Sequence, residues 1–158
     1  MDTATRDQLV KEYLAGPKLL RDALKGMNKE QLLAKPVAGK MSTLEVVCHL
    51  SDFDPIYVER MKRVIAMEKP SVLGADEDLF AKKLCYHDRD VEEELMLLDV
   101  TRRSMTRILN KLPLEAWSRE GIHSERGTMS LQKMVETMID HIPHHVKFIE
   151  EKRKALKV

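Results

Sequence analysis

The sequence predicts an all-α protein, a four-helix bundle with a long connection between its second and third helices. Four amphipathic stretches of about twenty to thirty residues each account for most of the 158-residue chain. Within them, apolar residues recur at steps of three and four, the spacing of one helix face. No alternating run of strand length occurs, apart from a short extended piece at residues 121–127. The ten methionines suit the irregular core of such a bundle.

The first predicted helix spans about residues 3–26, and residues 28–31 then begin a short capped turn. Because Pro17 lacks an amide N–H and follows Gly16, we expect the helix to kink or break there. Its apolar face consists of Leu9, Tyr13, Leu19, Leu20, Ala23 and Leu24.

The second predicted helix has a clear start. Ser42 and Glu45 form the S-x-x-E pattern of a capping box, in which each side chain binds the backbone N–H of the other residue. The helix then continues towards Glu68 and ends before Pro70, with a bend expected at Pro55.

The third and fourth predicted helices are separated by a loop. Residues 71–86 should be irregular or only briefly helical, and the third helix then runs from residues 88–90 until Pro113 stops it. The loop that follows contains Trp117 and two glycines. The fourth helix starts at a cap formed by Thr128 or Ser130 and ends near Leu156.

Composition excludes several classes of function. With 27 basic and 26 acidic residues, the chain has a formal charge of +1, and only 4% of its residues are aromatic, so neither a basic field nor stacking platforms indicate nucleic-acid binding. No apolar run is long enough for a membrane span or a signal peptide. Two distant cysteines form no disulfide framework, which favours the cytoplasm. The length predicts a single domain over residues 1–158.

Two histidines in the fourth predicted helix have the spacing of a metal site. His141 and His145 are four residues apart, so their imidazoles lie one above the other on one helix face. They continue an apolar seam with steps of three and four, and we therefore expect them to point into the core. Buried imidazoles without partners are costly, and a shared ligand would explain both. The seam consists of Leu131, Met134, Met138, His141, His145 and Phe148.

A third histidine strengthens the metal interpretation. His49 lies in the second helix on a stripe with Val46, Phe53 and Ile56, again at steps of three and four. Three inward histidines from two helices match an open metal site, with three protein ligands and room for water or substrate. Neutral imidazole suits zinc, nickel, copper or iron, and the sequence does not choose among them.

The other histidines carry weaker signals. His144 is turned by about 100° from its neighbour in the helix and should face outward or a partner. His87 and His123 are expected to be solvated loop histidines, of which His123 is the better further candidate because its loop leads into the fourth helix. Pro143 should bend that helix between the two paired histidines.

Side chains around His49 offer further candidates. Asp52, Tyr57 and Arg60 are candidates for orienting a ligand or binding substrate. For each of them a structural role is the preferred interpretation: Asp52 could simply face solvent, and Arg60 is expected in a surface or dimer ion pair. Cys48 adjoins His49, but neighbours on a helix point to different faces, so a cysteine–histidine nucleophile pair is not expected. No carboxylate is marked out as a general base.

Three stretches resemble the DinB-like (YfiT-type) metal-binding proteins. Residues 14–24 look like the first helix of that family, and residues 39–52 look like its second-helix motif, in which a histidine precedes a leucine and, shortly after, an aspartate. Residues 140–145, Asp-His-Ile-Pro-His-His, look like its last-helix motif. Met41 departs from the tryptophan that is usual there, and a proline between the ligand positions is unusual.

Carried over position by position, this resemblance implies His49, His141 and His145 as the three metal ligands. It also implies a bundle with a long crossover between the second and third helices, frequent homodimers, and a divalent metal ion such as zinc or nickel. Characterised relatives include S-transferases that use bacillithiol or mycothiol.

Three hypotheses of function follow. The first is a metal-dependent thiol S-transferase or hydrolase that acts on a small-molecule substrate. The second is a non-catalytic, metal-stabilised homodimer in a stress-response or binding role. The third is that the histidines bind nothing and line a polar cavity. An open coordination position would favour chemistry, whereas a fourth protein ligand would favour structure.

Overall fold

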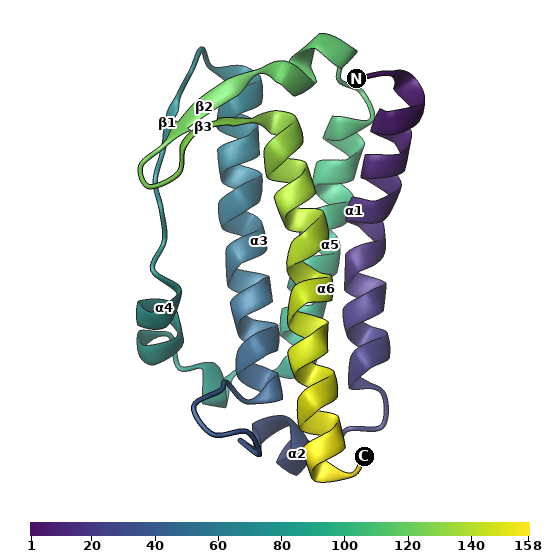
Figure 1. Cartoon of the computed structure of the whole chain (residues 1–158), viewed down its shortest axis with the longest axis vertical. Coiled ribbons are helices and arrows are strands. Elements are labelled where there is room, and N and C mark those ends of the chain that lie inside the picture. The colour runs from purple at the N-terminus through teal and green to yellow at the C-terminus, as the bar shows by residue number, and fades with distance from the viewer.

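Four long helices pack side by side in the computed structural model, which describes residues 1–158 (Figure 1). They confirm the predicted four-helix bundle. The long helices are α1 (Thr3–Leu24), α3 (Thr43–Ala66), α5 (Val91–Leu109) and α6 (Leu131–Leu156). Shorter elements are α2 (Lys29–Leu33), α4 (Glu77–Lys83), two 3₁₀ turns (Tyr86–Asp88 and Leu114–Ser118), and the strands β1 (Ser71–Val72), β2 (Glu120–His123) and β3 (Gly127–Ser130).

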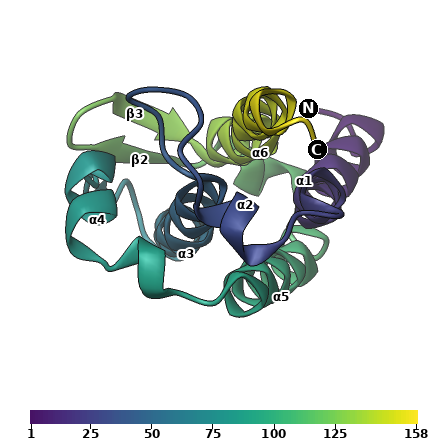
Figure 2. The ribbon, with the colours of Figure 1, turned by 90° about the horizontal axis from the view of Figure 1, so that it is seen from below.

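The helices are arranged so that α1 and α3 lie across the bundle from each other, and each packs against both α5 and α6 (Figure 2). Since α3 and α5 run in the same direction, the chain must return along the bundle between them. This return segment, residues 67–90, lies on the outer side of α3 and carries β1 and α4 (Figures 1 and 2). The predicted long crossover is confirmed.

The starts of the helices follow the expected capping chemistry. The Ser42 hydroxyl accepts a hydrogen bond from the Glu45 amide at 3.1 Å, and the Glu45 carboxylate accepts one from the Ser42 amide at 2.6 Å. Of the two cap candidates for α6, Ser130 is the one used, and its hydroxyl accepts from the Lys133 amide. Sequence patterns therefore locate the histidine-bearing helices closely.

A small sheet was only partly anticipated. Residues 120–130 form a hairpin of β2 and β3, and β1 from the crossover joins it in parallel beside β2. The Pro70 carbonyl accepts a hydrogen bond from the Ile122 amide, and the Val72 carbonyl accepts one from the Ser124 amide. These bonds tie the crossover to the hairpin. A two-residue strand shows no periodicity, so the sequence could not reveal β1.

A polar layer divides the apolar core. One cluster of buried side chains surrounds Trp117, and the other surrounds Tyr86. On α3 and α5, the residues between the two clusters include Asp54 and Arg102, which form a fully buried ion pair of 2.7 Å. Burial raises the pKa of Asp54, against the opposing charge of its partner. None of the helices combines the length and the apolar character needed to cross a membrane.

The Arg102 guanidinium connects α5 to the other three long helices. From α5 it donates to the Asp54 carboxylate on α3, to the Tyr13 carbonyl on α1 at 3.0 Å, and to the Met138 carbonyl on α6 at 2.7 Å. It also lies 4.7 Å from the centre of the Tyr13 ring. Charge-assisted hydrogen bonds of this kind are the strong ones, and here they fix the relative positions of the helices.

The same contact explains why α1 continues through Pro17, where we expected a kink or break. In a helix the amide of residue 17 would donate to the Tyr13 carbonyl, and proline has no such donor. Arg102 supplies the missing hydrogen bond. Gly16 provides the space, because a Cβ there would overlap Nη1 of Arg102 and lie 2.8 Å from Cδ1 of Ile142. The expected break is therefore wrong: a tertiary contact compensates for the proline.

The substitution Gly16→Ala tests this packing. Alanine in a helix normally stabilises by about 1 kcal/mol relative to glycine, but here we expect a loss of about 1–3 kcal/mol, because the buried guanidinium cannot move aside. The free energy of unfolding is measured by urea titration with circular dichroism. The exposed neighbour substitution Ala15→Gly reports helix propensity at the same turn. A Gly16→Ala variant as stable as the parent would contradict the proposed close packing.

Candidate metal centre

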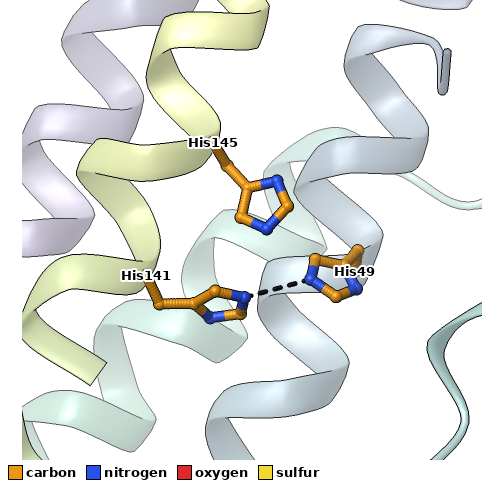
Figure 3. A group of neighbouring side chains, drawn as sticks. All are labelled: His49, His141 and His145. Atoms are coloured by element: carbon orange, nitrogen blue, oxygen red, sulfur yellow. Dashed lines mark hydrogen bonds between the residues drawn. The ribbon is translucent and has the colours of Figure 1, made fainter. Parts of the chain in front are cut away.

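Three histidines from two helices converge on one point inside the protein (Figure 3). His49 comes from α3, and His141 and His145 come from successive turns of α6. The Nε2 atoms of His49 and His141 are 3.0 Å apart, and one ring nitrogen from each of the three residues lies within 4.8 Å of the other two. The structure thus brings together the three residues that the sequence pattern selected.

The histidines of α6 lie beside the core seam rather than in it. Leu131, Met134 and Met138 are buried as expected, but beyond them Ile142 and Ile149 occupy the core. His141 and His145 are half-buried and line a cavity. The reason is the helical period: a stripe with a seven-residue repeat drifts by about 20° per repeat around a straight helix of 3.6 residues per turn. The expectation of core-facing histidines is corrected accordingly.

All three imidazoles are held in the neutral form. Burial lowers the pKa of His141 to about 2 and that of His145 to about 3, and the neighbouring imidazoles add to both shifts. Burial also lowers the pKa of His49, against the opposing charges of Glu77 and Asp52. A neutral imidazole retains a nitrogen lone pair, and this is the form that ligates metal ions.

Packing, rather than hydrogen bonding, orients the rings. The contact between the Nε2 atoms of His49 and His141 is the only hydrogen bond that the three rings form, and each of the three Nδ1 atoms is buried without a partner. The His49 ring packs on Phe53 with centroids 4.6 Å apart, and His145 packs on Phe148 at 5.9 Å. Buried polar atoms without partners cost free energy, which a ligand shared by the rings would offset.

A cavity of about 680 Å³ opens beside the histidines. Its walls come from α3, α6, the start of α4 and the β2–β3 hairpin. The volume lies in the range of small-molecule sites. The histidine cluster is therefore one wall of a cavity that can admit a substrate, and is not enclosed by protein on all sides.

Glu77 is the carboxylate nearest to the histidines. It lies in the first turn of α4, with Oε2 3.9 Å from Nε2 of His49, and its side chain is 65% exposed. The ring of Phe80, also in α4, packs against that of Phe53 at 5.5 Å and holds this helix beside the site. The sequence singled out no carboxylate as a general base. Glu77 comes near His49 only because the crossover folds beside the site.

His123 is not the solvated loop residue that we expected. It lies in β2, is only 4% exposed, and lines the same cavity as the three histidines. Its Nδ1 accepts a hydrogen bond from the Glu125 amide at 3.1 Å. The glycine-flanked sequence resembles a loop, whereas pairing with β1 and β3 makes it a strand.

The candidates near His49 are placed differently from expectation. Asp52 forms a two-pronged ion pair with Arg89 and has no hydrogen bond to His49. Arg60, expected in a surface or dimer ion pair, is 4% exposed and donates to the Leu73 carbonyl. Tyr57 is buried and lines the cavity, as a substrate-binding role requires.

The remaining residues agree with the sequence-based interpretation. His144 is exposed, with its ring packed edge-on against Phe148 at 5.0 Å. His87 is exposed and pairs with Glu45. The Cys48 thiol is buried and donates to a backbone carbonyl, and burial raises its pKa to about 12, which excludes a reactive thiolate. The α6 helix is continuous through Pro143, and the bend expected there stays a prediction.

Comparison with known proteins identifies the family. The model of the DinB superfamily matches residues 12–149. The chain belongs to the DinB superfamily. The solved structure of YfiT from Bacillus subtilis, described as a probable metal-dependent hydrolase with an unusual four-helix bundle topology, has a TM-score of 0.92 and covers 99% of this chain and 90% of its own. At 22% identity, this likeness establishes the shared fold.

Two relatives carry the name "putative metal-dependent hydrolase". The protein of Oceanobacillus iheyensis is 28% identical over 133 residues, which are 84% of this chain and 77% of that protein. The protein of Geobacillus thermodenitrificans is 33% identical over 98 residues, 60% of this chain and 55% of that protein. The DinB-like chain is thus similar to proteins whose names describe metal-dependent chemistry.

The substitution Phe80→Ala tests how α4 is held beside the histidines. Loss of the ring contact with Phe53 should let this seven-residue helix open more often, so we expect amide hydrogen exchange in residues 77–83 to accelerate by at least about tenfold while the four long helices are unchanged. Exchange is measured by mass spectrometry. Leu79→Ala, which removes an exposed side chain from the same helix, is the control. Equal exchange in both variants would show that the Phe80 ring does not hold α4.

Proposed function

We propose that this DinB-like protein is a divalent-metal-dependent hydrolase whose metal ion is held by His49, His141 and His145. The observation that carries the proposal is the convergence of three neutral imidazoles, one nitrogen of each within 4.8 Å of the others, on the wall of a cavity. The names of the two curated relatives support the choice of hydrolysis.

The three side chains fit a divalent ion. Zinc–nitrogen bonds are about 2.0–2.1 Å long, so two nitrogens on one ion lie at most about 4.2 Å apart. The three nitrogens lie within 4.8 Å of one another, so the rings would have to turn towards one another to hold a single ion. A set of three imidazoles suits zinc or nickel, and three protein ligands leave a position for water or substrate.

The protein side chains have distinct roles in this proposal. When bound, a divalent ion supplies a Lewis acid that polarises the bond to be broken and lowers the pKa of water. The Glu77 carboxylate, 3.9 Å from Nε2 of His49, is placed to accept a proton from a water molecule at the site. Phe53 and Phe148 line the cavity beside the histidines and exclude bulk water from one side.

The metal prediction concerns stoichiometry and affinity. Purified protein should bind one zinc or nickel ion per chain. Substitution of His49, His141 or His145 by alanine should weaken metal binding by more than about 100-fold, because the loss of a side chain that only hydrogen-bonds to a ligand already lowers metal affinity by about 10–100-fold. Metal content is measured by mass spectrometry of the metal, and affinity by calorimetric titration. His87→Ala removes an exposed histidine that is not one of the three proposed ligands, and it should leave metal content and affinity unchanged.

Thermal stability gives an independent readout of the same site. A ligand at one hundred times its dissociation constant stabilises the folded state by about 2.7 kcal/mol, so a chelator should lower the melting temperature and added zinc should restore it. If equimolar metal is absent and stability responds to neither treatment, the metal site and the proposed function fail together.

The substitution Glu77→Gln tests the proton acceptor. We expect kcat for p-nitrophenyl acetate to fall by about 10²–10⁴-fold while one metal ion per chain is retained. Asp78→Asn, which removes the adjacent exposed carboxylate of α4, is the matched control. An unchanged kcat in Glu77→Gln would exclude Glu77 as the general base, without affecting the metal prediction.

Thiol S-transfer is the second candidate activity, and the size of the cavity favours it, since about 680 Å³ can hold a thiol beside an electrophile. Reaction of monobromobimane with cysteine or bacillithiol, compared with ester hydrolysis, distinguishes S-transfer from hydrolysis.

The non-catalytic alternative requires a protein group that closes the fourth ligand position, and the open cavity disfavours it. A homodimer stays a prediction, which light scattering can test.

A further inference from the structure

The cavity extends well beyond the three histidines. Along α3 its lining residues are His49, Phe53, Tyr57 and Arg60, at steps of four, four and three. They therefore share one face of the helix and span about 16 Å along its axis at 1.5 Å per residue. The histidines lie at one end of this stripe. The other end, formed by Arg60, Arg126, His123 and Tyr57, is called the arginine end below.

Arg60 is a buried cation without an ion-pair partner. It is only 4% exposed, and none of the ion pairs in the protein includes it. Its Nη2 donates to the Leu73 carbonyl, while its Nε is buried and has no hydrogen-bond partner. A buried charge that lacks a paired counter-charge is costly, so a bound anion would stabilise this guanidinium.

The pKa of Arg60 reflects the same environment. Burial lowers the pKa of Arg60 and the charge of Arg126 adds to this shift, whereas Tyr57, Glu125 and Glu59 oppose it only in part. Glu59 is itself paired with Arg63. Neither Glu59 nor Glu125 forms an ion pair with the guanidinium of Arg60.

A second arginine reaches the same place from the β2–β3 hairpin. Nη1 of Arg126 donates to the Tyr57 hydroxyl at 3.0 Å, and the Arg60 guanidinium lies 4.9 Å from the centre of the same tyrosine ring. Tyr57 therefore holds two cations at one end of the cavity. Two like charges repel each other at short range, and an anion between them would turn this repulsion into attraction.

His123 adds a neutral donor to the two cations. Because its Nδ1 accepts a hydrogen bond from the Glu125 amide, the ring carries its proton on Nε2. Burial lowers the pKa of His123, and the charges of Arg60 and Arg126 lower it further. The arginine end thus presents two guanidinium groups and one N–H donor, a set that matches the oxygens of a carboxylate or phosphate.

The acidic residues that line the cavity form no ion pair with this end. Glu77 lies beside His49, and the Asp76 carboxylate accepts a hydrogen bond from the Leu79 amide as the cap of α4. The Glu125 carboxylate lies against Gly74, where a Cβ would collide with it. The carboxylate of Glu125 therefore lies near this end without forming an ion pair with either arginine.

We propose that the arginine end binds the carboxylate or phosphate group of an elongated small-molecule substrate, whose reactive bond then lies at the histidines. The substrate role rests on the function proposed above, whereas anion binding itself does not depend on a metal ion. The arginine end would select acidic substrates and set which bond reaches the histidines.

The test uses the full-length protein and its His141→Ala variant, with inorganic phosphate and succinate as separate probes. The Nε–H signals of Arg60 and Arg126 are followed by ¹H–¹⁵N NMR during titration, with sodium chloride at matched ionic strength as the reference. We expect saturable shifts of both signals, with the same dissociation constant in the His141→Ala variant. The probe that binds more tightly identifies the preferred anion.

Variants show whether the arginines cause the binding. Arg126→Gln changes an exposed side chain and should weaken binding of the tighter probe by at least about tenfold, and Arg60→Lys should weaken it while preserving the charge. Arg103→Gln removes one positive charge from the exposed face of α5 and should have no effect. Shifts no larger than those in chloride, or equal affinity in Arg126→Gln and Arg103→Gln, would overturn the proposal.

The two proposals fail separately. Saturable anion binding by a protein that takes up no metal would remove the hydrolase proposal and leave the anion site intact. Binding of one metal ion per chain without anion binding would remove the anion site and leave the hydrolase proposal intact.

Discussion

The buried guanidinium of Arg102 is the contact on which the geometry of this protein depends. It joins α5 to the Asp54 carboxylate on α3 and to backbone carbonyls of α1 and α6. The α6 carbonyl belongs to Met138, about one helical turn before His141. A polar contact in the middle of the bundle therefore joins α3 and α6 close to the histidines that both helices carry.

The site combines a rigid part with a part built from connections. The histidines project from two long helices, which fixes them with the precision that a metal centre needs. Glu77, His123 and Arg126 come instead from the crossover and the hairpin, which the β1–β2 pairing ties together. Connecting segments tolerate changes in sequence more readily than packed helices, so the loop-borne part of the cavity could change while the bundle keeps the histidines in place.

Sequence periodicity predicted the fold and the three histidines because long helices repeat their pattern over many turns. It failed where a single tertiary contact decides the outcome. Pro17 was expected to interrupt α1, yet Arg102 replaces the missing hydrogen bond. Arg60 was expected in a surface or dimer ion pair, and its burial at the end of the cavity depends on the segment that packs against it, to whose Leu73 carbonyl it donates.

The sequence by itself determined the all-α class, the cap of α3, and the choice of His49, His141 and His145, since each follows from spacing within one helix. The tertiary structure alone decided that these residues meet, that α6 turns its histidines towards a cavity, and that Glu77, His123 and two arginines surround the same space. The physical reason is that spacing fixes which side chains share a helix face, whereas the neighbours of that face are fixed by contacts between segments far apart in the chain.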